Sequence, residues 1–145
     1  MFMGRYQHTI DEKGRMTIPA RFRELLEDGA FITEGFENSI LVLTKKNFDA
    51  LWENGTTLSL TDPKVREFKR IFFGGASKVE FDKAGRILIP FFLREKAQLK
   101  DEALVVGMGE SFEIWSPENW KQQQTSLDMK KSDPQYFADL SISLR

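Results

Sequence analysis

The sequence predicts a mainly β fold with short helices (α+β), built from two copies of one small unit. A motif of turn residues and a proline occurs twice: residues 11–23, DEKGRMTIPARFR, align with residues 82–94, DKAGRILIPFFLR, at a constant offset of 71. From residue 35 the offset becomes 72, and GFENSILVLTKKNF (35–48) aligns with GMGESFEIWSPENW (107–120). Short apolar runs between turn signals have the length of strands. We interpret the pattern as the duplication of a unit of roughly 50 residues.

Each copy is predicted to begin with a strand, a tight turn and a second strand. Residues 5–10 are strand-like and are followed by the turn signal Asp-x-x-Gly. Gly14 is expected to take a positive φ, which a residue with a side chain resists. A short strand follows at 15–18. The second copy repeats this pattern with a strand at 77–81, a turn at Gly85 and a strand at 86–89.

A helix and a hairpin complete each copy. Pro19 and Pro90 end the second strands and favour a helix start, so we predict short helices at 20–27 and 91–98. The hairpins are predicted from strands at 30–34 with 39–43, and at 103–106 with 111–115. Thr44 and Ser116 then have the character of helix N-caps.

The segment between the copies predicts a packed helix. In LTDPKVREFKRIFFGG, Asp62 is a cap, Pro63 occupies the first turn, and the apolar residues fall on one helical face. We therefore divide the chain into a first domain (1–53), a connecting helix (54–75), a second domain (76–121) and a carboxyl-terminal tail (122–145). The tail is polar, is expected to be the least ordered part, and contains one short capped helix in DPQYFADL.

The composition is that of an ordinary globular protein and excludes several kinds of site. The chain has 145 residues, of which 41% are hydrophobic and 30% charged. It has no cysteine and a single histidine, His8, which excludes disulfides, thiolate metal sites and histidine metal clusters. There is no leader pattern, and no apolar run approaches the ~20 residues of a membrane span. We expect a cytoplasmic protein without a cofactor, a membrane partner or a small-molecule substrate.

The net charge of −1 conceals alternating charged blocks. Residues 1–23 carry +3 and residues 64–100 carry +6, whereas residues 24–63 carry −6 and residues 101–145 carry −4. A locally basic face on a neutral whole is sufficient for phosphate contacts, because screening limits the reach of each charge to about 10 Å.

The repeated Asp-x-x-Gly-Arg motif is the main candidate for chemistry. Asp11 and Asp82 can accept hydrogen bonds from turn N–H groups and can hold Arg15 and Arg86 through a charge-assisted bond. A two-stranded ribbon fits the DNA major groove, where an arginine can bind guanine O6 and N7, and one such contact discriminates between bases by about 1–3 kcal/mol. The alternative is that the two pairs are only salt bridges that brace the hairpins.

Neighbouring basic residues are candidates for phosphate contacts, which add affinity without selecting a sequence. They are Arg5, Lys13, Arg21, Arg23, Lys83 and Arg94. For Arg23 and Arg94 the alternative is a solvated charge on a helix. A unit of this size buries little area alone, so pairing within and between chains is expected.

These residues resemble the MraZ family of bacterial transcriptional regulators, which are tandem members of the AbrB-like (SpoVT-AbrB) DNA-binding group. GRYQHTIDEKGRMTIPARFRELL is similar to the family's first signature and FFGGASKVEFDKAGRILIPFFLREKAQL to its second, and FEIWSPENW resembles the segment that follows. The resemblance covers about residues 1–140. It implies a double swapped-hairpin β-barrel, with two tandem copies related by an internal pseudo-two-fold axis.

The same resemblance implies a function. Asp11 with Arg15 and Asp82 with Arg86 match the family's motif, with the arginines as DNA readers and Gly14 and Gly85 in the turns. It further implies a homo-oligomeric ring that binds repeated promoter boxes upstream of the division and cell-wall gene cluster at the nucleoid, usually as a repressor. One departure is that Phe91-Phe92 replaces Ala20-Arg21, which suggests that the second copy serves assembly more than phosphate binding.

Two other classes of function compete with this one. An enzyme would have to use His8 near Asp11 and Glu12, but the chain has no phosphate-binding loop, no nucleophile motif and no metal-ligand spacing. An antitoxin-like or scaffold protein would use the same hairpins to hold a protein partner. We therefore predict a DNA-binding regulator that is not an enzyme.

Overall fold

Strands and short helices follow one another in the same order twice. The computed structural model describes residues 1–142. The first copy contains β1 (Arg5–Thr9), β2 (Arg15–Thr17), α1 (Ala20–Leu25), β3 (Ala30–Glu34), β4 (Ile40–Thr44) and α2 (Lys45–Thr56). After α3 (Pro63–Phe72), the second copy contains β5 (Ser77–Val79), β6 (Arg86–Leu88), α4 (Phe91–Lys96), β7 (Glu102–Gly107), β8 (Ser111–Trp115) and α5 (Pro117–Lys131). The fold is mixed α+β and mainly sheet, as predicted, and the predicted elements of the two copies differ from the observed ones chiefly at their ends.

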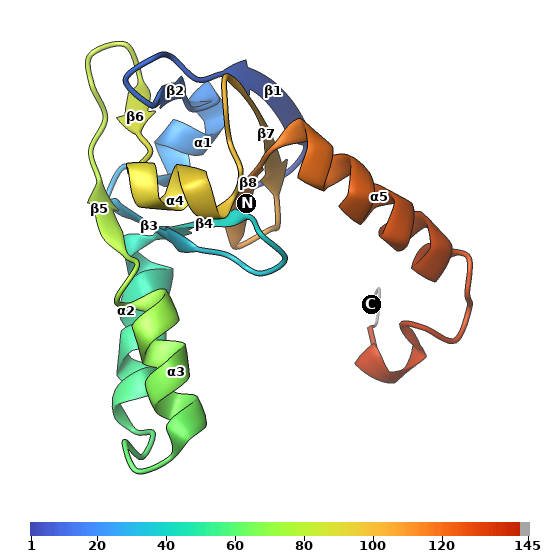
Figure 1. The fold of residues 1–145 in the computed structure, drawn as a ribbon. Coiled ribbons are helices and arrows are strands. Elements are labelled where there is room, and N and C mark those ends of the chain that lie inside the picture. The colour runs from blue at the N-terminus through green and yellow to red at the C-terminus, as the bar shows by residue number, and fades with distance from the viewer. Residues whose placement is uncertain (143–145) are drawn as a thin grey trace.

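The strands of the two copies are interleaved in one six-stranded sheet. Its order is β1-β7-β8-β4-β3-β5, and all its pairs are antiparallel. The first strand of each copy joins the hairpin of the other copy: β1 pairs with β7, and β5 pairs with β3. Strands β4 and β8 meet at the centre (Figure 1). Neither copy therefore forms this sheet from its own strands.

The remaining strands, β2 and β6, form a separate two-stranded ribbon. Met16 lies opposite Ile87 at its centre, and both side chains are buried. Single bridges join Ile10 to Met16 and Phe81 to Ile87, so each strand of the ribbon folds back on the end of the strand before it. Because successive side chains of a strand point to opposite faces, the residues on either side of Met16 and Ile87 face outward.

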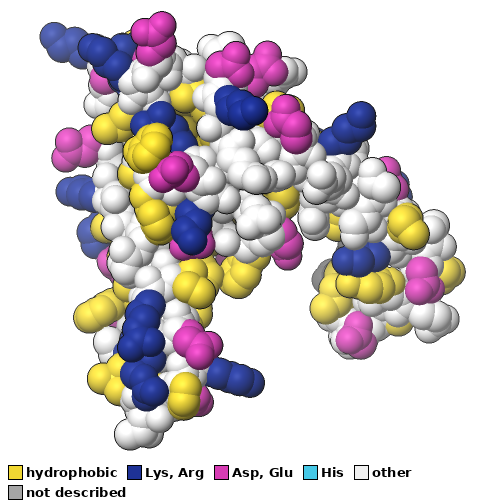
Figure 2. Space-filling model, in the orientation of Figure 1, with side chains coloured by type: hydrophobic (Ala, Val, Ile, Leu, Met, Phe, Trp, Pro, Cys, Tyr) yellow, Lys and Arg dark blue, Asp and Glu magenta, His cyan; other side chains and the backbone are white. Residues whose placement is uncertain are grey.

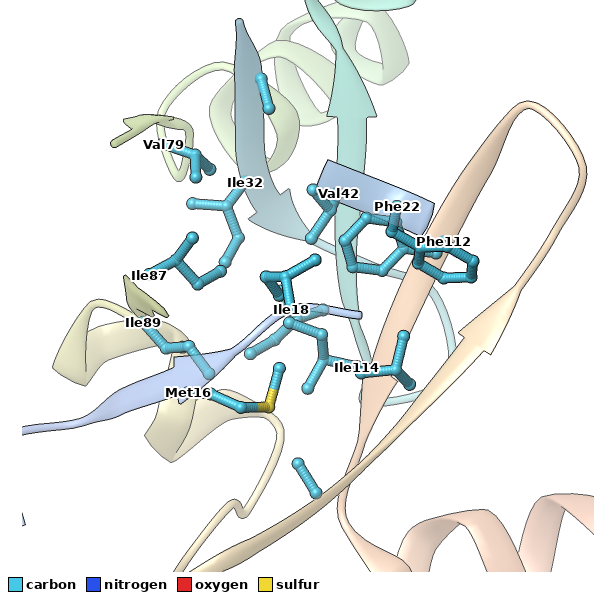
Figure 3. Close-up of a cluster of buried hydrophobic side chains, with 14 of the residues drawn as sticks. Met16, Ile18, Phe22, Ile32, Val42, Val79, Ile87, Ile89, Phe112 and Ile114 are labelled. Carbon is cyan, nitrogen blue, oxygen red and sulfur yellow. The ribbon is translucent and has the colours of Figure 1, made fainter. Parts of the chain in front are cut away.

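One hydrophobic core lies beneath the ribbon and the sheet. Its side chains come from both copies, as Figure 3 shows for Met16, Ile18, Phe22, Ile32, Val42, Val79, Ile87, Ile89, Phe112 and Ile114. The rings of Phe22 and Phe112, one from each copy, lie 5.0 Å apart. Because both copies share this core, the interleaved arrangement buries apolar surface from both, and that burial stabilises it.

The connecting helix α3 is capped and packed as the sequence predicts. The Asp62 side chain accepts a hydrogen bond from the Lys64 N–H at 2.9 Å, and Pro63 occupies the first turn. At the other end, the buried Thr33 hydroxyl donates to the Phe72 carbonyl oxygen at 2.7 Å. Figure 1 shows α2 and α3 as a helical hairpin that extends away from the sheet.

In residues 1–142 the tail differs from its prediction, and the predicted barrel is not seen as a closed one. Helix α5 continues to Lys131, well past residue 121, where the sequence predicts only a polar tail, and DPQYFADL forms only the 3-10 helix η1 (Ala138–Leu140). No ladder joins β1 to β5 in the described part of the chain, so the sheet keeps two open edges and no closed barrel is found. No described helix has the length and apolar character needed to cross a membrane.

Candidate nucleic-acid interface

The turn between β1 and β2 is built around Asp11. One carboxylate oxygen, Oδ1, accepts hydrogen bonds from the Lys13 N–H at 3.0 Å and from the Arg15 N–H at 2.9 Å. The other, Oδ2, accepts a hydrogen bond from Arg15 Nε at 2.7 Å. Gly14 has φ +85°, a conformation that favours glycine, and its N–H donates to the Asp11 carbonyl oxygen. The aspartate thus fixes the turn and the arginine together.

The second copy repeats this geometry closely. Asp82 accepts hydrogen bonds from the Ala84 and Arg86 N–H groups, both at 2.9 Å, and from Arg86 Nε at 2.8 Å. Gly85 has φ +76°. These bonds lower the pKa of both aspartates, chiefly through the backbone N–H of Arg15 for Asp11 and of Arg86 for Asp82. Both carboxylates are therefore ionised at neutral pH.

The terminal nitrogens of the two arginines are left available. Aspartate holds the Nε edge of each guanidinium, and the side chains of Arg15 and Arg86 are 34% and 35% exposed. The only other ion pair of these two groups in residues 1–142 joins Arg86 Nη1 to Asp11 Oδ2 at 3.7 Å, which is too long for a hydrogen bond. The hydrogen bond at Nε thus fixes the orientation of each guanidinium and leaves its Nη groups able to donate.

Both arginines lie on the outward face of the ribbon. Arg15 is opposite Leu88, and Thr17 is opposite Arg86, while Met16 and Ile87 point into the core. In this register Arg15 and Arg86 are diagonal neighbours on the two strands. Such diagonal positions are separated by roughly 7–8 Å. The sequence motif predicted two separate turns, and the strand pairing brings their arginines onto one surface.

Arg23 and Arg94 brace the turns from beneath. Arg23 Nη1 donates to the Ile18 carbonyl oxygen at 3.0 Å, and Arg94 Nε donates to the Ile89 carbonyl oxygen at 3.0 Å. Each guanidinium packs against the turn glycine of the opposite copy. A Cβ on Gly85 would collide with Arg23 Nη1, and one on Gly14 would lie 2.6 Å from Arg94 Cζ.

The other predicted basic residues are divided between two places. Lys13 and Lys83 are exposed in the turns, and Arg21 is exposed on α1. Figure 2 shows lysine and arginine side chains at the turn end of the molecule and again along the α2–α3 hairpin, at the opposite end in Figure 1. Arg5 lies apart from the turns, at the start of β1, where its guanidinium carbon is 4.9 Å from the centre of the Trp120 ring.

Two features of this region were not found by sequence reasoning. One is the packing of Arg23 and Arg94 on the opposite copy's glycine, for which the only signal was that both arginines and both glycines recur at the same offset. The other is that the basic block 64–100 is divided between the two ends of the molecule, because α3 lies away from the turns and carries Lys64, Arg66, Lys69 and Arg70.

In residues 1–142, His8 forms no side-chain hydrogen bond or ion pair with Asp11 or Glu12. It lies on β1 opposite Ala103, and burial lowers its pKa. Its neighbours in a shallow pocket are Gln7, Thr9 and Glu102. No group of residues in the described chain could hold a metal ion.

The interleaved sheet and the paired Asp–Arg turns define a tandem-repeat β protein whose two copies share one exposed ribbon. The family model described as "MraZ protein, putative antitoxin-like" matches this chain twice, over residues 1–71 and 72–139. The chain belongs to the MraZ family, which confirms the predicted resemblance.

Similar proteins cover nearly the whole chain. "Transcriptional regulator MraZ" of Roseiflexus castenholzii is 41% identical over 145 residues, which are 100% of this chain and 99% of the relative. The protein of the same name from Thermomicrobium roseum is 46% identical over 127 residues (88% of this chain and 89% of the relative). That from Carboxydothermus hydrogenoformans is 46% identical over 120 residues (83% and 84%). A family of transcriptional regulators agrees with the prediction that the chain is not an enzyme.

Proposed function

We propose that the chain is a sequence-specific DNA-binding transcriptional regulator that inserts the β2–β6 ribbon into the major groove. The observation that carries this proposal is the pair of aspartate-anchored arginines on the outward face of one ribbon. With Nε held by aspartate, the Nη groups of Arg15 and Arg86 can each approach guanine O6 and N7. A separation of roughly 7–8 Å between the two positions corresponds to about two base-pair steps of 3.4 Å.

Phosphate contacts are assigned to the side chains around the ribbon. Lys13 and Lys83 at the turn tips and Arg21 on α1 are exposed and have the reach to bind the backbone on either side of the groove. Arg23 and Arg94 pack against the turn glycines Gly85 and Gly14, so their loss would act on DNA binding through the geometry of the turns.

The test is a DNA-binding titration on the region upstream of the protein's own gene. Arg15→Ala and Arg86→Ala should each weaken binding about tenfold or more, because a bidentate guanine contact contributes about 1–3 kcal/mol. The effect of Arg15→Ala should be the larger. Wild-type affinity should fall steeply with salt, as expected when phosphate charges are neutralised.

Arg70→Ala is the matched control, because Arg70 is an exposed arginine on α3, away from the ribbon. It should bind DNA within about twofold of the wild type if the ribbon selects the sequence. Circular dichroism should be unchanged in all three variants. If wild-type protein at low salt does not prefer the upstream DNA to a scrambled duplex, the proposal fails.

The finer features of fold and assembly belong to the same proposal. The exchange of β1 and β5 between the copies favours a double swapped-hairpin AbrB-like arrangement, with units at 1–53 and 76–121, a connection at 54–75 and a tail at 122–145. A homo-oligomeric ring would let several ribbons bind repeated promoter boxes, each weak contact gaining by avidity. We propose that the regulated genes are the division and cell-wall cluster and that the usual outcome is repression at the nucleoid.

A second candidate is an antitoxin-like module that holds a protein partner. The family's description favours it, because that description contains the term antitoxin-like. The two candidates predict opposite results for Arg15→Ala with Arg86→Ala: DNA binding is lost if the ribbon reads bases, whereas capture of a protein partner would survive both changes.

A further inference from the structure

A cavity of about 280 Å³ lies beside the start of α5, away from the Asp–Arg turns. Its walls come from β1, β7, β8, α5 and the loops between β3 and β4 and between β7 and β8. They include Trp115, Trp120, Glu113, Glu37, Arg5 and Met108. Two indole rings and two carboxylates line this cavity. Indole faces and carboxylates both attract cations, so the lining favours an organic cation.

Glu113 is the least expected member of this set. Its side chain is only 7% exposed, and Trp115 Nε1 donates a hydrogen bond to its Oε1 atom at 2.9 Å. Burial raises the pKa of Glu113 and the charge of Glu37 adds to this, whereas side-chain hydrogen bonds from Trp115 and Ser39 act in the opposite direction. In residues 1–142 no lysine or arginine nitrogen lies within ion-pair distance of either carboxylate. Hydrogen bonds alone therefore stabilise the ionised form of Glu113, and a cation beside it would favour that form further.

The duplication provides an internal comparison for this position. At the offset of 72, Glu113 corresponds to Leu41 and Trp115 to Leu43. In the first copy these leucines line an apolar surface that Phe68 and Phe72 of the α2–α3 hairpin also line. The same strand position is therefore satisfied by leucine in one copy, which indicates that the fold itself does not require a carboxylate there.

The aromatic wall already accepts one cation. The Arg5 guanidinium carbon is 4.9 Å from the centre of the Trp120 ring, within the range of a cation–π contact. The Trp115 and Trp120 rings are 5.5 Å apart and inclined at 68°, so they form two sides of a corner. Arg5 is exposed, and it covers one of these two rings.

We propose that this cavity binds a small organic cation, a guanidinium or alkylammonium group, between the Trp115–Trp120 corner and the Glu113 carboxylate. The cation is either a free small molecule or the end of an arginine or lysine side chain of another copy of this chain. The site does not depend on DNA binding, so its test needs no DNA.

The experiment is a tryptophan-fluorescence titration of full-length protein carrying Trp52→Phe, which removes the one indole outside the cavity. The probe is butylguanidinium, and butylurea is its neutral counterpart of nearly the same shape. We expect saturable binding of butylguanidinium and binding about tenfold or more weaker for butylurea, because only the first carries a charge for Glu113.

Variants then separate the proposed site from a general surface effect. Glu113→Gln should weaken butylguanidinium binding about tenfold or more, whereas Glu118→Gln, an equal change of charge on the exposed side of α5, should leave it unchanged. Glu113→Leu restores the residue of the first copy, so it should stay folded and lose binding. Arg5→Gln removes the cation that covers Trp120 and should tighten binding.

The source of the cation is decided by oligomer size in light scattering. This step rests on the proposed homo-oligomer. If saturating butylguanidinium dissociates that oligomer, the natural cation is a side chain of another copy; if the size is unchanged while binding occurs, it is a free molecule. The proposal would be overturned if butylguanidinium left the tryptophan fluorescence unchanged both in the protein that keeps Arg5 and in Arg5→Gln. Equal binding of butylurea and butylguanidinium would also overturn it.

Discussion

At the scale of single residues, the Asp–Arg turns couple a charge to the geometry of the backbone. Each aspartate accepts two backbone N–H bonds and one guanidinium bond, and all three favour its ionised form. The aspartate therefore holds the arginine in place only while it is ionised. This makes the orientation of Arg15 and Arg86 sensitive to acid.

The first prediction concerns this sensitivity. The pKa values of Asp11 and Asp82 are lowered from 3.8, so the stability they contribute is present above that pH and is lost as the pH falls through the lower folded-state pKa values. Carboxyl carbon NMR should give midpoints below 3.8 for both residues, and Arg15→Ala should move the Asp11 midpoint upward. A midpoint of Asp11 at or above the ordinary value would contradict the bonding described.

The second prediction concerns the turn glycines. Gly14→Ala should destabilise the protein by about 1–3 kcal/mol, because a side chain resists the positive φ and because the new Cβ would collide with the Arg94 guanidinium. Urea unfolding measures the change. Gly109→Ala is the control, since Gly109 also has a positive φ but open space around its Cβ position. Equal losses for the two variants would show that the contact with Arg94 contributes nothing.

Prediction from sequence succeeded at this scale where the interaction was local. Asp11 and Arg15 are four residues apart in one turn, so their types and spacing predict the contact. Arg23 and Gly85 come from different copies, and no rule of spacing joins them until the strand pairing is known. For the same reason Arg5 could not be separated from the turn residues by charge alone.

At the scale of elements, the β2–β6 ribbon is held by very few residues. Met16 and Ile87 are its inward side chains, 0% and 1% exposed, and their contact with the core fixes which face turns outward.

The third prediction is that Met16→Ala destabilises the protein by about 2–5 kcal/mol in urea unfolding, as for other large-to-small core changes. Thr17→Ala, its outward neighbour, should change stability by less than about 0.5 kcal/mol. Similar losses for both would mean that the ribbon's inward face does not anchor it.

Helix α5 shows the limit of prediction for elements. The Ser116 hydroxyl accepts a hydrogen bond from the Asn119 N–H at 3.1 Å, so the start of the helix follows from its cap. The body of the helix has no buried residue and therefore no apolar periodicity to detect. Its glutamines and lysines are good helix formers, and that intrinsic preference extends the helix beyond the part that packs.

At the scale of the whole molecule, the exchange of strands makes the two copies inseparable. β1 completes the second copy's hairpin, β5 completes the first copy's, and side chains of both fill one core. The repeat in the sequence predicts two equal units, but it does not say whether each pairs with itself or with the other. That choice depends on contacts far apart in the chain, which local patterns do not contain.

The fourth prediction follows from this exchange. Fragments 1–75 and 76–145, expressed separately, should each lack the dispersed amide NMR spectrum of a folded protein, because each would leave sheet edges and half a core exposed. An equimolar mixture should recover that spectrum. Two fragments that are each folded alone would contradict the shared core.

A DNA-binding ribbon with perfect two-fold symmetry binds a DNA site and its reverse complement equally well. The rotation that exchanges the two DNA strands also exchanges the two ends of the ribbon. The ribbon here is only nearly symmetric: Ala20-Arg21 flanks one end and Phe91-Phe92 the other, with Phe91 64% exposed. On the proposed function, each promoter box therefore has a direction. Boxes repeated in the same direction would align successive copies head to tail, the arrangement from which closed rings are built.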